Sequence, residues 1–293
     1  MNTICGFPDI DIYLLYFLDI ASVMRLITIS QEQNRLLNNL DFITELKILK
    51  RKRCVPKDII YCASKYNLLS LIIWIDESIN KFTYDKSVIS NASQNGNIKI
   101  LEWFDKSNHE FKYSRCAIIN ACMYGNINVL EWFAKSKYEF KYDKSTIIYA
   151  CQNGYVNVLE WFDKSKYELK YDESAIMFAS KYGHSNVLDW FANSKSRGRP
   201  YEFKYDNKAI NLAAFAGRIN ILEWFDKSGY EFKYDVNAII YAAANNHVIV
   251  LEWFKNSKYQ FLYDKQAIRE ARYYKCYDVL AWFKENGYTK TNM

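Results

Sequence analysis

A tryptophan returns along this chain at a nearly constant interval. Successive tryptophans stand 29 residues apart, except for the 34 residues between Trp190 and Trp224. Self-similarity at a fixed period of this size is typical of stacked-repeat proteins, in which each repeat contacts only its neighbours. The tryptophans are Trp74, Trp103, Trp132, Trp161, Trp190, Trp224, Trp253 and Trp282.

The same residue types return at fixed offsets from each tryptophan. Isoleucine stands fourteen residues before it and alanine eleven residues before it in every repeat. Residues three apart share one face of a helix, so this pair predicts a first helix whose small alanine admits a neighbouring helix. A second helix then carries apolar residues, the tryptophan and a phenylalanine, as in Val158, Leu159, Trp161 and Phe162. We expect the tryptophan and phenylalanine of every second helix to be buried between repeats.

Polar residues and glycines mark the ends of the first helix. An aspartate, or Ser114 in one repeat, stands eighteen residues before the tryptophan, where it suits an N-cap. Glycine or asparagine stands seven residues before it, as at Gly154 and Asn246, and suits a left-handed helix end. Each repeat is therefore expected to read helix, tight turn, helix and short extended link. The expected repeats are 56–84, 85–113, 114–142, 143–171, 172–205, 206–234, 235–263 and 264–293.

This pattern resembles the ankyrin repeat over about residues 56–293. Isoleucine takes the place of the leucine in the Thr-Pro-Leu-His signature, alanine follows three later, and glycine follows four after that. The usual Thr-Pro and His are missing, and the repeat is shorter than the usual length of about 33 residues. The resemblance implies an all-α fold, an ankyrin-like helical solenoid of eight stacked helix pairs with reduced finger loops. Short Trp-Phe repeats of this composition also resemble those of large DNA viruses of protists.

Residues 1–53 lack the repeat and predict a small N-terminal helical segment. Phe7-Pro8, Leu18-Asp19, Ser22-Val23 and the run from Leu26 to Ser30 resemble an F-box, with Phe7 in place of the usual leucine. The resemblance implies a Skp-type ubiquitin-ligase adaptor as partner, held by Pro8, Leu18, Val23 and Leu26. The alternative is a cap that covers the apolar end of the stack. The array itself is expected at 54–293.

Composition narrows the remaining classes of function. The net charge is +6, but acidic and basic residues alternate along the repeats, so we expect no nucleic-acid partner. No apolar run is long enough to cross a membrane, and the seven cysteines indicate reduced thiols. We therefore expect an intracellular, cytoplasmic location, in a host cell if the protein is viral. We also expect a monomer.

No residue pattern in the chain specifies a catalytic chemistry. No phosphate loop, nucleophile elbow or metal-spaced cysteine pair occurs, and His184 and His247 simply start second helices. We therefore predict no enzyme activity and no cofactor. The insertion at 196–200 lengthens one link. Its role stays open between a tolerated loop, a contact for an acidic partner and a protease-sensitive tip.

The sequence does predict a partner-binding surface. Twelve and nine residues before the tryptophan, the first helix varies while its neighbours stay fixed, and the resemblance places these positions on the concave side. In the middle of the array they become apolar, which predicts either a protein-binding stripe or lateral packing against the next repeat. The residues are Met123, Tyr149, Phe178, Leu212, Phe215 and Tyr241.

Overall fold

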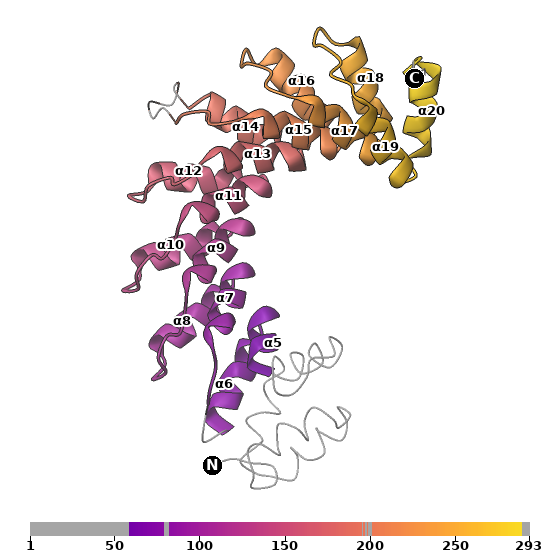
Figure 1. Ribbon diagram of the computed structural model, residues 1–293. Helices are drawn as coiled ribbons and strands as arrows, with labels where there is room; N and C mark the ends of the chain where they lie inside the picture. Colours follow the sequence, from indigo (N-terminus) through magenta and orange to yellow (C-terminus); the bar gives the residue numbers. More distant parts are fainter. Residues whose placement is uncertain (1–58, 79–81, 195, 197, 199–200, 289–293) are drawn as a thin grey trace. The chain divides into compact units, whose positions relative to one another are not determined.

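The computed structural model describes residues 59–78, 82–194, 196, 198 and 201–288 (Figure 1). All regular secondary structure in this described part of the chain is helical. The chain divides into two compact blocks between Tyr142 and Asp143, which is also the predicted boundary between the third and fourth repeats. We call them the N-terminal block and the C-terminal block. The predicted N-terminal segment, 1–53, lies outside the described residues.

Each block is a series of helix pairs, and in Figure 1 the first helices of a block lie in one row and its second helices in another. The described residues of the N-terminal block form α5 (Ile59–Lys65) and α6 (Leu69–Ser78), α7 (Lys86–Gln94) and α8 (Ile98–Lys106), and α9 (Arg115–Met123) and α10 (Ile127–Lys135). Those of the C-terminal block form α11 (Lys144–Gln152) and α12 (Val156–Lys164), α13 (Glu173–Tyr182) and α14 (Ser185–Ala192), α15 (Asn207–Phe215) and α16 (Ile219–Lys227), α17 (Val236–Ala244) and α18 (Val248–Asn256), and α19 (Lys265–Tyr273) and α20 (Tyr277–Glu285).

The first helices begin where the sequence predicts. From α7 onward, the side-chain oxygen of the N-cap residue accepts a hydrogen bond from the backbone N–H two residues later. At α11 the Asp143 carboxylate accepts from the Ser145 N–H at 2.9 Å. This bond satisfies one of the amide groups that a helix start leaves free. The N-caps are Asp85, Ser114, Asp143, Asp172, Asp206, Asp235 and Asp264.

The turn between the paired helices is the same in every described repeat. In the turn that follows the first helix, a single residue has positive φ. The backbone N–H of the residue after it donates to the carbonyl of the repeat alanine, as from His184 to Ala179 at 2.9 Å. This six-to-one bond is the helix ending for which glycine or asparagine is favoured. The sequence analysis missed one member, since Lys275 adopts φ 57° in the last repeat. The predicted members are Asn67, Gly96, Gly125, Gly154, Gly183, Gly217 and Asn246.

The core follows the fixed positions of the repeat. The alanine of every repeat is fully buried, and the isoleucine three residues earlier is buried from Ile89 onward. Within each block successive first helices pack closely, whereas successive second helices touch only lightly. Small side chains allow this close approach of the first helices. The predicted all-α, ankyrin-like helical solenoid is confirmed for the described residues.

The prediction that both aromatic residues of the second helix are buried is half wrong. The phenylalanine is buried in all seven repeats where it occurs, from Phe104 to Phe283. Among the tryptophans whose side chains are described, only Trp190 and Trp282 are buried, and the other five are half-buried. In three of these five, Trp132, Trp224 and Trp253, the indole stacks on a link phenylalanine, as Trp253 does on Phe232 at 5.5 Å and 20°.

The last repeat carries charge where its siblings are apolar or small. Arg269 and Arg272 are exposed on α19, whereas the equivalent Ile240 and Ala243 of α17 are buried against the next repeat. An arginine at a covered position would need a buried partner. These two residues therefore give this repeat a charged outer side, unlike the apolar outer side of the repeat before it.

Candidate partner-binding surface

The six predicted partner-binding residues all lie on first helices, and each is half-buried. In each block, these residues and the residues at the same repeat positions form one surface of the first helices, which we call the first-helix face. Part of each side chain is exposed to solvent, while the repeat alanine and isoleucine of the same helix are buried. They are Met123 on α9, Tyr149 on α11, Phe178 on α13, Leu212 and Phe215 on α15, and Tyr241 on α17.

Two of these residues come into contact in the C-terminal block. The rings of Phe215 and Tyr241 pack edge to face, with centroids 6.0 Å apart and planes at 87°. The Nζ atom of Lys181 lies 5.4 Å from the centroid of Phe215, within the range of a cation–π contact. A partner that covers this part of the face would meet two aromatic rings beside one ammonium group.

The same positions are more polar in the N-terminal block. The Asn120 side-chain amide donates to the Ser90 carbonyl at 3.2 Å, which joins α9 to α7. Asn91 is 8% exposed, and its amide nitrogen has no hydrogen-bond partner among the described residues. Of the predicted apolar members only Met123 belongs to this block, so the aromatic part of the face lies in the C-terminal block.

The first helices that present this face are fixed by side chains from the following repeat. In six repeats the residue that begins the second helix reaches back to the last carbonyls of the first helix of the preceding repeat, as Asn126 does to Gln94 at 2.7 Å. These carbonyls have no partner within their own helix. Other such bonds run from Asn97 to Ser64, His184 to Gln152, Arg218 to Lys181, His247 to Phe215 and Cys276 to Ala244.

Two of these residues are titratable. Burial lowers the pKa of His184 and of His247, the bond to a backbone carbonyl opposes the shift, and the charge of Arg218 adds to it. The His184 ring lies so close to Gly154 that a Cβ atom there would stand 2.6 Å from Nδ1. Burial of these rings thus favours the neutral imidazole over the charged form.

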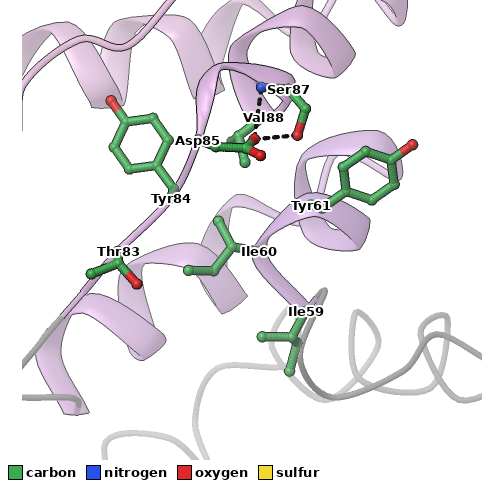
Figure 2. Close-up of a pocket in the computed structure, with 8 residues that line it drawn as sticks. All are labelled: Ile59, Ile60, Tyr61, Thr83, Tyr84, Asp85, Ser87 and Val88. Atoms are coloured by element: carbon green, nitrogen blue, oxygen red, sulfur yellow. Dashed lines mark hydrogen bonds between the residues drawn. The ribbon is translucent and has the colours of Figure 1, made fainter.

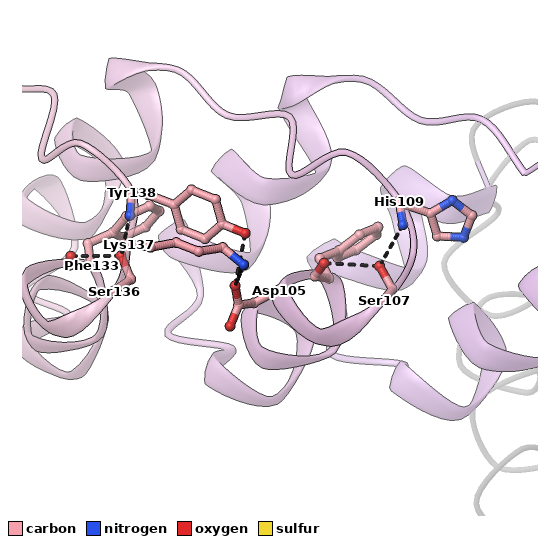
Figure 3. Close-up of polar contacts among 8 residues, drawn as sticks. Asp105, Ser107, His109, Phe133, Ser136, Lys137 and Tyr138 are labelled. Atoms are coloured by element: carbon pink, nitrogen blue, oxygen red, sulfur yellow. Dashed lines mark hydrogen bonds and ion pairs between the residues drawn. The ribbon is translucent and has the colours of Figure 1, made fainter.

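A second set of polar contacts ties the links to the second helices (Figure 3). The Asp105 carboxylate accepts from the Tyr138 hydroxyl at 2.9 Å and lies 3.1 Å from the Lys137 ammonium. The bonds from Lys137 and Tyr138 hold the pKa of Asp105 below its ordinary value, while burial and then the Asp105 bond raise the pKa of Tyr138. The same cross-repeat pair recurs as Tyr201 with Asp163 and Tyr259 with Asp226, and as His109 with Asp76.

Another tyrosine, which the sequence analysis did not single out, joins consecutive links. The tyrosine just before the N-cap residue donates its hydroxyl proton to a backbone carbonyl in the next link, at 2.7 to 3.1 Å in four repeats. Its fixed place beside the N-cap was the available signal. The pairs are Tyr84 to Glu110, Tyr113 to Glu139, Tyr171 to Glu202, Tyr205 to Glu231, Tyr234 to Gln260 and Tyr263 to Tyr288.

A shallow pocket of about 510 Å³ lies between α5 and the start of α7 (Figure 2). One side is lined by Ile59, Ile60 and Tyr61, and the other by Thr83, Tyr84, Asp85, Ser87 and Val88. Its carboxylate, Asp85, is occupied as the N-cap of α7 and accepts from the N–H and hydroxyl of Ser87. These bonds lower the pKa of Asp85, whereas burial raises the pKa of the neighbouring Tyr84.

No group of histidine, cysteine and acidic residues among the described residues could hold a metal ion, and none of their helices is long and apolar enough to cross a membrane. Burial raises the pKa of the Cys122 and Cys151 thiols, which keeps them protonated and poor nucleophiles.

The F-box-like residues Pro8, Leu18, Val23 and Leu26 lie outside the described residues, so the adaptor hypothesis stays a prediction. Its test is capture of a purified Skp-type adaptor by the full chain. Capture that is lost in a Leu18→Asp, Val23→Asp double variant, while the repeats stay folded, would support it.

The features above define a helical repeat protein built from ankyrin-like pairs. No family model matches the chain, and no curated protein matches it. Among solved structures the chain is similar to the human ASB11 ankyrin repeat domain, at 13% identity and a TM-score of 0.43, with 60% of this chain and 86% of that chain covered. A likeness of this size says nothing about partners, and the assignment of the fold rests on the helix pairs, turns and caps themselves.

Proposed function

We propose that this chain is a non-enzymatic scaffold for protein–protein interaction that holds its partner on the first-helix face of the C-terminal block. One observation carries the proposal. On four consecutive first helices the framework alanine and isoleucine stay fixed and buried, while the position between them carries half-exposed apolar residues. These are Tyr149, Phe178, Leu212 and Tyr241.

The physical argument is the cost of leaving such side chains in water. Partly exposed aromatic and aliphatic residues side by side gain free energy when a partner removes them from solvent. Aromatic residues are also enriched in protein interfaces, where they provide much of the affinity. Asn91 and Asn120 show that the stack accepts polar residues at the same position, so packing alone does not demand the aromatic ones.

The test is a Phe178→Ala, Tyr241→Ala double variant of the full chain. Partners captured from the native cell are identified by mass spectrometry, produced in pure form and measured against both proteins by calorimetry. We expect the double variant to stay folded and to bind at least about tenfold more weakly. The matched control is a Glu160→Ala, Lys164→Ala variant, which removes two exposed side chains of α12. A folded double variant with unchanged affinity for every purified partner would contradict the proposal.

A further inference from the structure

A groove between second helices has features that the stacking of the repeats does not require. It has a volume of about 580 Å³ and lies between α16 and α18, in the C-terminal block, on different helices from those of the first-helix face. We call it the α16–α18 groove. Its lining residues are Ile219, Glu223, Asp226, Ile249, Glu252, Trp253, Asn256, Ser257 and Lys258.

Ile249 is the anomalous residue of this groove. It is 59% exposed, although the equivalent position carries an asparagine in four other repeats and a polar or charged residue in the remaining three. There the side-chain amide donates to the carbonyl of the glycine that ends the preceding first helix: Asn128 to Gly96 at 3.1 Å, Asn186 to Gly154 at 3.0 Å and Asn220 to Gly183 at 2.8 Å. An isoleucine cannot donate this hydrogen bond. The repeat therefore lacks one hydrogen bond to the preceding repeat and has an apolar side chain exposed to water in its place.

A second group in the groove is also left available. The Trp224 indole N–H donates to the Asp189 carboxylate at 2.7 Å. Its counterpart Trp253, in the α16–α18 groove, makes no such bond to any described residue, and its ring is half-buried. The groove therefore offers two apolar surfaces, from Ile249 and Trp253, beside one hydrogen-bond donor.

The charge of the groove selects the kind of partner. Its lining contains three carboxylates and one ammonium group, in a chain whose net charge is +6. Asp226 is occupied by Lys258 at 2.8 Å and by the Tyr259 hydroxyl at 3.0 Å. Glu223 lies 3.7 Å from Lys227, with both side chains largely in solvent, and Glu252 is exposed. Such a rim repels phosphate groups, which disfavours nucleic acids and anionic lipid surfaces.

We propose that the α16–α18 groove binds a short basic and apolar segment of a partner protein. An aliphatic or aromatic side chain of the segment covers Ile249 and Trp253, and its lysine or arginine residues lie against Glu223 and Glu252. The exposed Ile249 is the anchor of the site, and the lost asparagine bond is the structural cost of carrying it. This site is independent of the first-helix face.

The experiment measures binding of a labelled peptide of about 12 residues that alternates leucine and lysine pairs. As a helix it is slightly longer than either nine-residue helix that flanks the groove. A peptide with glutamate in place of each lysine is the charge control. We expect the basic peptide to bind the full chain, to weaken as salt is raised, and to bind at least about tenfold more tightly than the acidic peptide.

The informative variant is Ile249→Asn, which restores the residue of the sibling repeats. We expect it to raise the midpoint of denaturation, because the amide can donate to the Gly217 carbonyl, and to weaken the basic peptide at least about tenfold. Glu252→Lys should also weaken it, whereas Glu160→Lys, the same change at the same repeat position on α12, should not. The Phe178→Ala, Tyr241→Ala variant should bind the peptide normally, which separates this site from the first-helix face.

Several results would overturn the proposal. They are no binding of the basic peptide up to about millimolar concentration, equal binding of the acidic peptide, or unchanged affinity in Ile249→Asn. Self-association that sedimentation detects and Ile249→Asn abolishes would show instead that a second copy of the chain covers the groove.

Discussion

First helices and second helices of the same repeats hold their neighbours through different side chains. Between first helices the contacts are close and involve alanine, serine and cysteine, as at the fully buried Ala179 and Ser180. Between second helices and links the contacts are aromatic stacks and hydrogen bonds, as at Asp105 and Tyr138. Small residues fix the distance between neighbouring helices, whereas aromatic and polar residues fix their lateral register.

This difference explains where the chain can vary. The closely packed first helices, which we call the close layer, tolerate change only on their partly exposed side, where Tyr149 and Phe178 lie. The second helices and links, which we call the outer layer, tolerate the loss of single hydrogen bonds. Ile249 stands where sibling repeats carry an asparagine, and the repeats still stack. Binding surfaces are therefore expected at the edge of the first layer and in the grooves of the second.

The largest expected effect comes from truncating the buried phenylalanine of a second helix. Phe162 is 1% exposed on α12, and Phe162→Ala should lower the free energy of unfolding by about 3–5 kcal/mol. The adjacent Trp161 is only half-buried, so Trp161→Ala should cost clearly less despite its larger ring. Urea denaturation of both variants measures the difference. Equal losses would show that burial does not separate the two aromatic positions.

A smaller effect should distinguish the close layer from the outer one. Ala179→Leu places a larger side chain where α13 packs against neighbouring first helices and should cost about 1–3 kcal/mol. Ala192→Leu, at a half-buried position in α14 of the same repeat, should be nearly neutral. Thermal and urea unfolding of the pair test this, and a costly Ala192→Leu with a neutral Ala179→Leu would reverse the comparison.

The loss of a single hydrogen bond between a link and a second helix should lower the free energy of unfolding only modestly. Tyr138→Phe removes the bond to Asp105 and keeps the ring stacked on Phe111 at 4.2 Å, so the expected loss is about 0.5–1.5 kcal/mol. Tyr230 occupies the same place in a later repeat, but the preceding repeat carries Ala192 in the position of the aspartate. Tyr230→Phe should therefore change the unfolding free energy less. If both changes cost the same, the carboxylate bond contributes nothing measurable.

The smallest expected effect is a dependence on pH. The pKa values of His184 and His247 are lowered by burial, so the unfolded chain, with an ordinary histidine pKa of about 6.5, binds these protons more readily. The stability from the neutral rings is present above about pH 6.5 and is lost as the pH falls through the lowered values.

Denaturation midpoints between pH 7.5 and 5 measure this loss, in a range above the lowered carboxylate pKa values of Asp105, Asp172 and Asp226. His184→Asn with His247→Asn, which copies Asn97 and Asn126, should flatten the profile. An unchanged slope in the double variant would assign the pH dependence to other groups.

Much of the fold could be predicted because its signals are local. N-caps such as Asp143, the left-handed Gly154 and the alanine carbonyl that accepts the turn bond all act within a few residues of one another. Lys275 was missed because a lysine can adopt the same backbone conformation when the turn around it is fixed.

The candidate surfaces were predicted less completely. The variable positions of the first helices could be recognised from the repeat, which located residues such as Phe178 and Tyr241. The α16–α18 groove could not, because the contrast between Ile249 and the asparagines of its siblings has meaning only once their bonds to a preceding glycine are known.

The sequence by itself determined the repeat, the ends of its helices and the small residues between first helices, because each depends on backbone hydrogen bonds and sterics over a few positions. Tertiary structure alone decided which aromatic rings are covered. Trp253 and Trp282 each stand 21 residues after a link phenylalanine and six residues before a tyrosine that stacks on the indole, yet only Trp282 is buried. Packing across repeats sets those contacts, and the spacing of one repeat does not contain them.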